Sequence, residues 1–242
     1  MGPGSRKLGA VALALIGLAG ASCSQQDSAA ATKPIIDAPT PYTVIFARHA
    51  VSESNIQVAM GRADNDLPLT EKGHEQADQL SRNLQEFGID SIYASSMLRA
   101  TQTALAVADD RGMPVTITSK IREVGFGAET LASESGVLNQ MRNWLDGIDR
   151  SEGYGGESYD ELMVRFGDFW SEFVHENRGK EGAGLVVAHG AALMLAVPEL
   201  CDNTVSSDTV FSTRLDYTST IVAELNEDGT LNCREWNGVP VT

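Results

Sequence analysis

The sequence predicts an α/β fold: a doubly wound three-layer sandwich whose sheet is mostly parallel, with an antiparallel strand pair at the C-terminal end. Three observations predict this class. Short apolar, β-rich runs alternate with segments of helical periodicity from Tyr42 onward. Histidine and arginine side chains follow the ends of several of these runs. The last two runs flank Asp228-Gly229, a typical hairpin turn.

The first part of the domain contains two strand and helix units. Thr43–Ala47 is a short apolar, β-rich run and predicts a buried strand. Thr70 is the predicted N-cap of a helix that ends at Gly88. The pattern then repeats, because Ser91–Ala94 predicts a strand and Leu98–Asp110 a helix.

The second part continues the alternation and ends in a hairpin. Val115–Thr118 is strand-like, and helical periodicity covers Gly136–Ile148 and Ser158–Asn177. Leu185–Ala188 predicts another buried strand, followed by a helix through Leu200. The hairpin strands are Thr220–Leu225 and Leu231–Trp236.

The N-terminal segment has the pattern of an export signal. Arg6 and Lys7 precede the uncharged apolar run Leu8–Gly20, which is too short for a comfortable transmembrane helix. Small residues and Cys23 follow, and this pattern resembles the lipobox of bacterial lipoproteins. We therefore expect residues 1–22 to be a signal peptide, and the chain to be extracytoplasmic and anchored to the bacterial cell membrane through a lipid on Cys23. Plain secretion and an uncleaved anchor are the alternatives.

Residues 23–41 predict a flexible tether, because they are mostly Gln, Ser, Ala, Thr, Asp and Pro with few large apolar side chains. Residues 42–242 contain no evident repeat and no Pro- or Ser-rich break. We interpret them as one domain.

The composition excludes several function classes. With 42% hydrophobic residues the chain can bury a sizeable core, which excludes a disordered or collagen-like protein. The formal net charge of −15 repels a phosphate backbone, so we expect no nucleic-acid partner. A small anionic substrate therefore requires a local cluster of cationic side chains.

The residues that carry chemistry follow the predicted strands. Arg48 and His49 end the first strand, and His189-Gly190 ends the strand Leu185–Ala188. Arg99 follows the second strand by a few residues. Each of these side chains alone is ordinary, but ligands bind at the carboxyl ends of strands in open α/β sheets. Their coincidence indicates a ligand site.

Four short motifs occur in one order along the chain. They are Arg48-His49-Ala50 with Asn55, Leu67–Gly73, Ser95–Ala100 and Ala188-His189-Gly190. This order resembles the histidine phosphatase superfamily, whose fold is phosphoglycerate mutase-like. The resemblance spans Tyr42 to nearly the C-terminus.

The resemblance implies that His49 is the nucleophile and forms a phosphohistidine, with His189 as a further catalytic side chain. It implies a phosphate pocket made of Arg48, Asn55, Arg99, His189 and Gly190. The residue types fit these roles, since guanidinium groups bind two phosphate oxygens at once and nearby cations keep an imidazole neutral. The other ring nitrogen of His49 needs an acceptor that fixes its tautomer.

The resemblance also implies an acid for the leaving group. Glu123, followed closely by Gly125, matches the family's glutamate, and a neighbouring carboxylate such as Glu129 is the alternative. Such an acid contributes roughly 10²- to 10⁴-fold to the rate. The segment Gly155–Ser158 resembles the family's Gly-Glu-Ser turn into its last long helix.

The chain also departs from the family pattern. Ala50, Val51, Ala128 and Ala191 replace residues that are commoner in the family, which leaves the substrate open. The stretch between Glu123 and His189 is short beside the mutases of the family, and this favours hydrolysis.

The sequence therefore predicts a metal-independent phosphomonoester hydrolase without a cofactor, acting on a small phosphomonoester or a phosphoprotein. No His-x-x-x-His or Cys-x-x-Cys spacing occurs, so no transition-metal site is indicated. A phosphoglycerate mutase-like phosphotransferase and a non-catalytic phosphate-binding lipoprotein are the alternatives. Cys201 and Cys233 are candidates for a disulfide in an oxidising compartment, with free thiols as the alternative.

Overall fold

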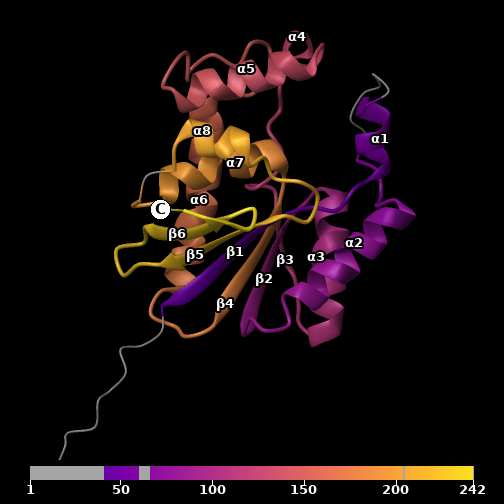
Figure 1. The fold of residues 1–242 in the computed structure, drawn as a ribbon, viewed down its shortest axis with the longest axis vertical. Helices are drawn as coiled ribbons and strands as arrows, with labels where there is room; N and C mark the ends of the chain where they lie inside the picture. The colour runs from indigo at the N-terminus through magenta and orange to yellow at the C-terminus, as the bar shows by residue number, and fades with distance from the viewer. Residues whose placement is uncertain (1–40, 60–65, 204, 242) are drawn as a thin grey trace, which may run out of the picture. The chain divides into compact units, whose positions relative to one another are not determined.

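The computed structural model describes residues 41–59, 66–203 and 205–241. The predicted signal peptide, Cys23 and residues 23–40 of the predicted tether lie outside the described residues. Within the described part, the strands form a seven-stranded sheet in the order β3-β2-β4-β1-β5-β6-β7 (Figure 1). The strands are β1 (Tyr42–Arg48), β2 (Ile89–Ser95), β3 (Thr116–Thr118), β4 (Ala183–Ala188), β5 (Thr220–Leu225), β6 (Leu231–Trp236) and β7 (Val239–Pro240).

The sheet is mixed, as predicted. Strands β3, β2, β4 and β1 pair in parallel, and β5, β6 and β7 continue the sheet with antiparallel pairing. The final hairpin is found at the predicted residues. The sequence did not indicate β7, which has two residues and pairs with the end of β6.

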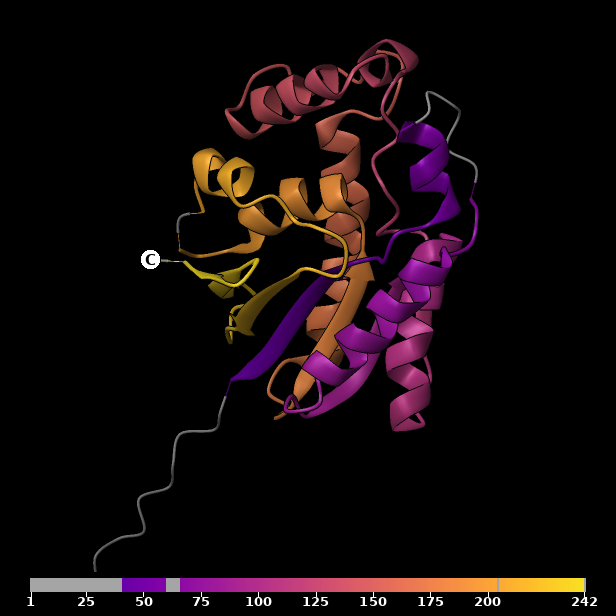
Figure 2. The same cartoon turned by 45° about the vertical axis from the view of Figure 1, so that its right-hand side comes forward.

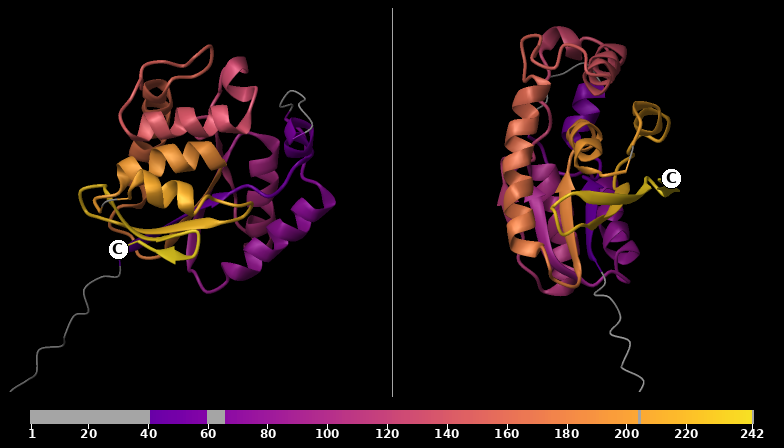
Figure 3. Two further views of the ribbon diagram at one scale, coloured as in Figure 1. Left: turned by 45° about the horizontal axis from the view of Figure 1, so that its top comes forward. Right: turned by 90° about the vertical axis from the view of Figure 1, so that its left-hand side faces the viewer.

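Helices cover both faces of the sheet (Figures 2 and 3). One face is covered by α2 and α3, and the other by α6 and α7. The described helices are α1 (Glu53–Ala59), α2 (Glu71–Asn83), α3 (Leu98–Arg111), α4 (Ala128–Leu131), α5 (Glu134–Leu145), α6 (Tyr159–Asn177), α7 (Gly190–Leu200) and α8 (Ser207–Ser212). This arrangement confirms the predicted three-layer sandwich.

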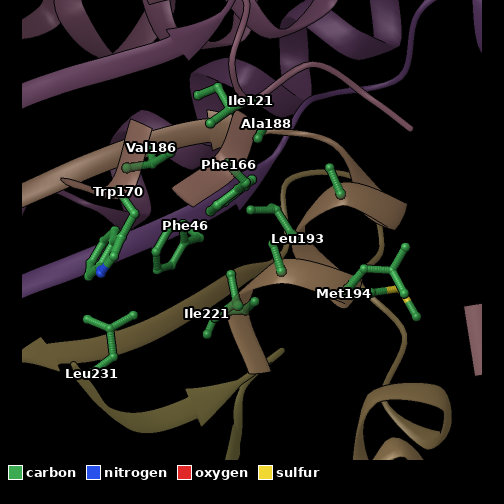
Figure 4. Close-up of a cluster of buried hydrophobic side chains, with 14 of the residues drawn as sticks. Phe46, Ile121, Phe166, Trp170, Val186, Ala188, Leu193, Met194, Ile221 and Leu231 are labelled. Atoms are coloured by element: carbon green, nitrogen blue, oxygen red, sulfur yellow. The ribbon is translucent and has the colours of Figure 1, made fainter. Parts of the chain in front are cut away.

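The alternation of side chains along β1 explains the three layers. Val44 and Phe46 point into the larger core with α6 and α7, while Ile45 and Ala47 pack with α2 and α3. All four side chains are fully buried, so β1 is apolar on both faces. Figure 4 shows Phe46 packed among side chains of the sheet, α6 and α7.

Side-chain caps set several helix starts. Thr70 accepts a hydrogen bond from the Gly73 N–H at 2.9 Å, as the predicted cap requires. At Gly73 a Cβ would collide with the Val51 carbonyl oxygen, so glycine permits this close approach. Helix α5 begins two residues before its predicted start, because Ser133 caps it by accepting from the Gly136 N–H.

A disulfide links the end of α7 to β6. It joins Cys201 and Cys233, whose Cα atoms are 5.6 Å apart. The side chain of Asn203 binds both the N–H and the carbonyl of Cys233 beside it. The disulfide therefore holds the end of α7, the helix that follows the parallel strand β4, against the antiparallel strand β6.

None of the helices in the described ranges is both long enough and apolar enough to cross a membrane.

Candidate active site

Two histidines meet where β1 and β4 end side by side. These strands are parallel neighbours, with Arg48 opposite Ala188, and the His49 N–H donates to the Ala188 carbonyl at 3.0 Å. The imidazole rings of His49 and His189 lie edge to face with centroids 5.0 Å apart. Both side chains are almost completely buried. Strand register thus brings together two residues that are far apart in the chain.

The hydrogen bonds of His49 assign its tautomer. Its Nδ1 lies 2.8 Å from the Ala50 carbonyl oxygen, which only accepts, so Nδ1 carries the hydrogen. Its Nε2 receives the Nε–H of Arg99 at 3.1 Å and is therefore the unprotonated nitrogen. Nε2 is the ring atom that can act as a nucleophile. Ala50 is the acceptor that the predicted mechanism requires.

Burial keeps the pKa of His49 well below its ordinary value, and the charges of Arg99 and then Arg48 lower it further. The bond to the Ala50 carbonyl acts in the opposite direction and is a smaller effect than burial and the charge of Arg99. His49 is therefore neutral at neutral pH, as a nucleophilic imidazole must be.

A fixed loop holds His49 in place. The Ala50 N–H donates to Thr103 Oγ1 at 3.0 Å, and this hydroxyl donates to the Arg99 carbonyl at 2.7 Å. Thr103 thus joins the loop after β1 to the first turns of α3. The same helix supplies Arg99, whose side chain is buried. The nucleophile and the guanidinium group are positioned by one element.

Ser95, at the end of β2, orients His189. Its Oγ lies 2.7 Å from His189 Nε2 and also accepts the Met97 N–H at 3.3 Å. A hydroxyl can donate to Nε2 or accept from it, so the tautomer of His189 decides which of the two atoms is the donor. Nδ1 is buried and has no hydrogen-bond partner in the described part of the chain. Burial holds the pKa of His189 well below its ordinary value, helped by His49, Arg99 and two further arginines.

Arg48 is held against the loop that precedes β5. Its Nη1 donates to the Leu215 carbonyl at 2.7 Å, and its guanidinium carbon lies 4.2 Å from the ring centroid of Tyr217. Its Nε is buried and has no hydrogen-bond partner among the described residues. A Cβ at Gly190 would lie 3.2 Å from this nitrogen, so the glycine at the start of α7 leaves room for the guanidinium group.

The carboxylate of Glu123 lies at the N-terminus of α7, next to His189, which caps this helix. It accepts the N–H groups of Ala192 at 2.9 Å and Ala191 at 3.3 Å, as well as that of Val124 at 3.0 Å. Helix N-termini favour negative charge at this position. The predicted acid and the second histidine are therefore neighbours. The side chain of Glu129, the alternative acid, lies outside the described residues.

Arg165 of α6 fixes the loop that carries Glu123. It donates to the carbonyls of Lys120 at 2.7 Å and Glu123 at 3.3 Å, and it forms a bidentate ion pair with Glu157. Glu157 lies in the predicted Gly-Glu-Ser turn, where Ser158 caps α6 in a capping box. One arginine thus connects this turn to the loop of Glu123.

Asn55, a predicted residue of the phosphate pocket, uses its side-chain oxygen in the turn that follows His49. Its Oδ1 accepts hydrogen bonds from the backbone N–H and the hydroxyl of Ser52, at 3.0 and 2.8 Å. These bonds fix the start of α1 on the segment after His49. The described contacts place Asn55 near this turn and do not join it to either histidine.

Sequence reasoning missed several residues of the site. Ser95 lies inside a motif used for the resemblance, but only the pairing of β2 with β4 shows that it contacts His189. Leu215 and Tyr217 belong to no motif. In the described ranges, no group of three or more His, Cys, Asp or Glu side chains has an arrangement that could hold a metal ion.

Comparison with known proteins agrees with this geometry. The model of the histidine phosphatase superfamily (branch 1) matches residues 44–238. The Enterobacter sp. (strain 638) protein named "Probable phosphoglycerate mutase GpmB" is 27% identical over 184 residues, covering 72% of this chain and 84% of its own.

Solved structures share the fold. Mycobacterial glucosyl-3-phosphoglycerate phosphatase in complex with VO3 has a TM-score of 0.64 at 20% identity, covering 81% of this chain and 99% of its own. The Shigella flexneri alpha-ribazole phosphatase has a TM-score of 0.59 at 23% identity, covering 83% and 99%. The family model matches most of the chain, and paired histidines with arginines lie at the strand ends. The chain belongs to the histidine phosphatase superfamily.

Proposed function

We propose that this protein is a metal-independent phosphomonoester hydrolase that acts through a phosphohistidine on His49. The observation that supports this most directly is a pair of buried nitrogens, Arg48 Nε and His189 Nδ1. Neither has a hydrogen-bond partner among the described residues, and both belong to side chains beside His49. A buried polar nitrogen without a partner is costly, so Arg48 Nε–H favours an acceptor that arrives with a ligand, and His189 Nδ1 favours a ligand group that can pair with it. A phosphoryl group supplies such oxygens, and Arg99 adds a second guanidinium group.

The first chemical step follows from the tautomer of His49. Its Nε2 attacks phosphorus, the phosphorus–oxygen bond of the ester breaks, and the leaving oxygen takes a proton from Glu123. The ring gains positive charge, which the Ala50 carbonyl stabilises through Nδ1–H. The arginines and His189 stabilise the charge on the phosphoryl oxygens. Losing one such donor typically costs about 10²- to 10³-fold in turnover.

The second step reverses the roles. Water attacks phosphorus, the phosphorus–nitrogen bond breaks, and Glu123 takes the proton from the water. Inorganic phosphate leaves, and His49 returns to its neutral form. Because the low pKa of His49 disfavours an imidazolium, the phosphorylated ring is a good leaving group in this pocket.

A phosphotransferase is the second candidate, and the curated relatives named as phosphoglycerate mutases favour it. Hydrolysis is supported by the short stretch between Glu123 and His189. The two candidates differ in the phosphoryl acceptor. A mutase transfers the group to a second alcohol and is stimulated by a bisphosphorylated compound, whereas a hydrolase transfers it to water.

We also propose that the protein is an extracytoplasmic lipoprotein, with its lipid on Cys23. The basic and apolar pattern of residues 6–20 supports export. The Cys201–Cys233 disulfide supports an oxidising compartment, since such bonds are rare in the cytosol. Detergent-phase partitioning of the full-length chain tests the anchor. Equal partitioning of the Cys23→Ser variant would contradict it.

The function is tested by hydrolysis of 4-nitrophenyl phosphate with and without chelator. We expect activity that resists the chelator and falls at least about 10³-fold in His49→Ala, because the nucleophile is lost. Glu123→Gln should slow an alkyl phosphate more than the aryl ester, whose leaving group needs little protonation. Unchanged turnover in His49→Ala would refute the phosphohistidine.

A further inference from the structure

The loop between α8 and β5 passes the end of β1 and wraps around Arg48 (Figure 2). The backbone N–H of Arg48 donates to the Ser219 carbonyl at 3.0 Å, and the Arg48 carbonyl accepts from the Thr218 N–H at 3.1 Å. The side chain of Arg48 donates from Nη1 to the Leu215 carbonyl at 2.7 Å. Residues 215–219 therefore hold both the backbone and the side chain of this arginine.

Thr218 has a backbone conformation that β-branched residues rarely adopt. Its φ is +62°, in the left-handed region that favours glycine. Its hydroxyl donates to the Tyr217 carbonyl at 2.6 Å, while its N–H donates to the Arg48 carbonyl. Strain of this kind persists where the surrounding contacts over-determine the backbone, and it often lies at functional sites. The strained turn fixes the place of Tyr217, the residue before it.

Tyr217 and Gly190 both contact the guanidinium group of Arg48. The ring centroid of Tyr217 lies 4.2 Å from the guanidinium carbon, which is a cation–π contact. At Gly190 a Cβ would lie 3.2 Å from Nε and 3.4 Å from Cζ, so the backbone of this glycine approaches the guanidinium group closely. Together with the Leu215 carbonyl, these contacts restrict how the guanidinium plane can turn.

The orientation of this plane decides what Arg48 offers to a ligand. Its Nη1 is engaged by the Leu215 carbonyl, whereas its Nε is buried and has no hydrogen-bond partner in the described part of the chain. The ring centroid of Tyr217 is also 6.0 Å from that of His49, so the cation–π contact lies beside the proposed nucleophile. If the guanidinium group turned, its Nε–H would point in another direction.

The contacts of Tyr217 involve its ring. Within the described ranges, its hydroxyl has no hydrogen-bond partner. The side chain is half-buried, whereas His49 and His189 are buried. Tyr217 therefore lies between the histidine pair and the solvent, where a smaller side chain can be introduced without opening the main core.

We propose that Tyr217 is a positioning residue, whose ring holds Arg48 in the orientation that gives Nε–H to a phosphoryl oxygen. The inference rests on the proposed hydrolase function and adds a residue that belongs to none of the four sequence motifs. A donor that is held in place before the reaction stabilises the transition state without being reordered. Loss of the ring should therefore lower kcat more than it raises KM.

The first test compares two substitutions of Tyr217. Tyr217→Leu removes the ring, and we expect it to lower kcat for 4-nitrophenyl phosphate about tenfold while KM changes less than about threefold. Tyr217→Phe keeps the ring, so its kcat should stay within about twofold of the original value. A loss in Tyr217→Phe as large as that in Tyr217→Leu would assign the effect to the hydroxyl and refute the proposal.

The choice of ester separates positioning from stacking on the leaving group. The leaving group of 4-nitrophenyl phosphate is aromatic, whereas that of glycerol 3-phosphate is an alkyl alcohol with no ring to stack on Tyr217. Tyr217→Leu should slow both esters equally, because Arg48 binds the phosphoryl group that they share. A loss confined to the aryl ester would contradict the proposal and indicate that the ring contacts the leaving group.

A double variant tests whether Tyr217 acts through Arg48. In Arg48→Gln the group that the ring holds is gone, so adding Tyr217→Leu should lower kcat by less than about twofold more. A further tenfold loss would show that Tyr217 acts independently of Arg48. Tyr154→Leu is the matched control, because Tyr154 is an exposed tyrosine bonded to Asp149 and should leave both esters unchanged.

Calorimetry with inorganic phosphate and with vanadate measures binding without turnover. Vanadate can adopt the five-coordinate geometry of the transition state. Tyr217→Leu should therefore weaken vanadate about tenfold and phosphate less than about threefold, and Tyr217→Phe should change neither. If no ester is hydrolysed but this pattern holds, the hydrolase proposal fails and the positioning role stands. If esters are hydrolysed and Tyr217→Leu matches the original protein in kinetics and binding, the positioning role is refuted and the hydrolase stands.

Discussion

At the scale of single residues, the site depends on which ring nitrogen of each histidine carries the hydrogen. For His49 a backbone carbonyl decides it, and for His189 the partner of Nε2 is the hydroxyl of Ser95. Both rings are buried beside arginines, which disfavours their charged forms. The same arrangement that makes His49 a nucleophile therefore makes the folded state sensitive to acid.

We expect the free energy of unfolding to fall as the pH drops below about 6.5, the ordinary histidine pKa. The folded pKa values of His49 and His189 lie well below this value, so the unfolded chain binds protons first. Stability is fully present above about pH 6.5 and declines toward the folded pKa values. Each histidine contributes a slope of about 1.4 kcal/mol per pH unit in that window.

Urea unfolding between pH 7.5 and 5 measures this slope. His49→Gln and His189→Gln should each lower this slope by about 1.4 kcal/mol per pH unit, because each variant lacks one group that titrates on unfolding. Glutamine keeps a polar side chain at both positions. A slope that is identical in the original protein and in both variants would show that these histidines do not titrate on unfolding.

The sequence predicts the residues at the strand ends but not what surrounds them. Arg48, His49 and His189 follow strand ends, so alternation and apolar runs predict that they lie at one edge of the sheet, while the strand order that makes them neighbours comes from the structure. Ser95 and Tyr217 act on them from other parts of the chain, and no local pattern indicates such contacts. The role of Asn55 in the phosphate pocket stays a prediction, since the structure shows only that its Oδ1 accepts hydrogen bonds from Ser52.

At the scale of elements, long helices and apolar strands were predictable because periodicity is strong over many residues. Helix α6 spans 19 residues and was predicted almost to its ends. Helices α1, α4 and α8 have 7, 4 and 6 residues, too few for a periodic pattern to emerge. One of these short helices lies beside the candidate site, since α1 follows the loop that carries His49.

Arg165 of α6 holds the loop that carries Glu123 through hydrogen bonds to its backbone. Arg165→Lys keeps the charge but cannot reach two carbonyls and a carboxylate at once, so the loop of Glu123 should loosen. We expect turnover of glycerol 3-phosphate to fall about tenfold and that of 4-nitrophenyl phosphate less than threefold. Steady-state kinetics on both esters measures this split.

The control for this prediction is Arg178→Lys at the end of the same helix. Arg178 donates to the Glu227 carbonyl on the surface and should leave both rates unchanged. An equal loss on both esters in Arg165→Lys would mean that Arg165 supports the whole pocket rather than the acid.

At the scale of the whole molecule, the disulfide closes a sequence separation of 32 residues between α7 and β6. Replacing Cys201 and Cys233 by serine should lower the free energy of unfolding by about 3–4 kcal/mol, mainly by freeing the unfolded chain. Activity should persist, because neither cysteine contacts the histidine pair. Denaturant titrations with and without reductant measure the loss.

Mass spectrometry of the unreduced, alkylated protein provides an independent check. A protein in which both thiols become alkylated before reduction would contradict the link. A variant that loses stability while the original protein is insensitive to reductant would instead indicate a packing effect of the two sulfur atoms.

The strand order also bears on how the chain is made. Strand β1 is synthesised first, yet its neighbours in the sheet are β4 and β5, which end at Ala188 and Leu225. The edge of β2 that faces the centre of the sheet also stays unpaired until β4 has been synthesised. A growing chain therefore cannot form the centre of its sheet, or join His49 to His189, until most of its length has left the ribosome. Such a delay leaves β1 without either of its sheet partners for most of the time in which the chain is made.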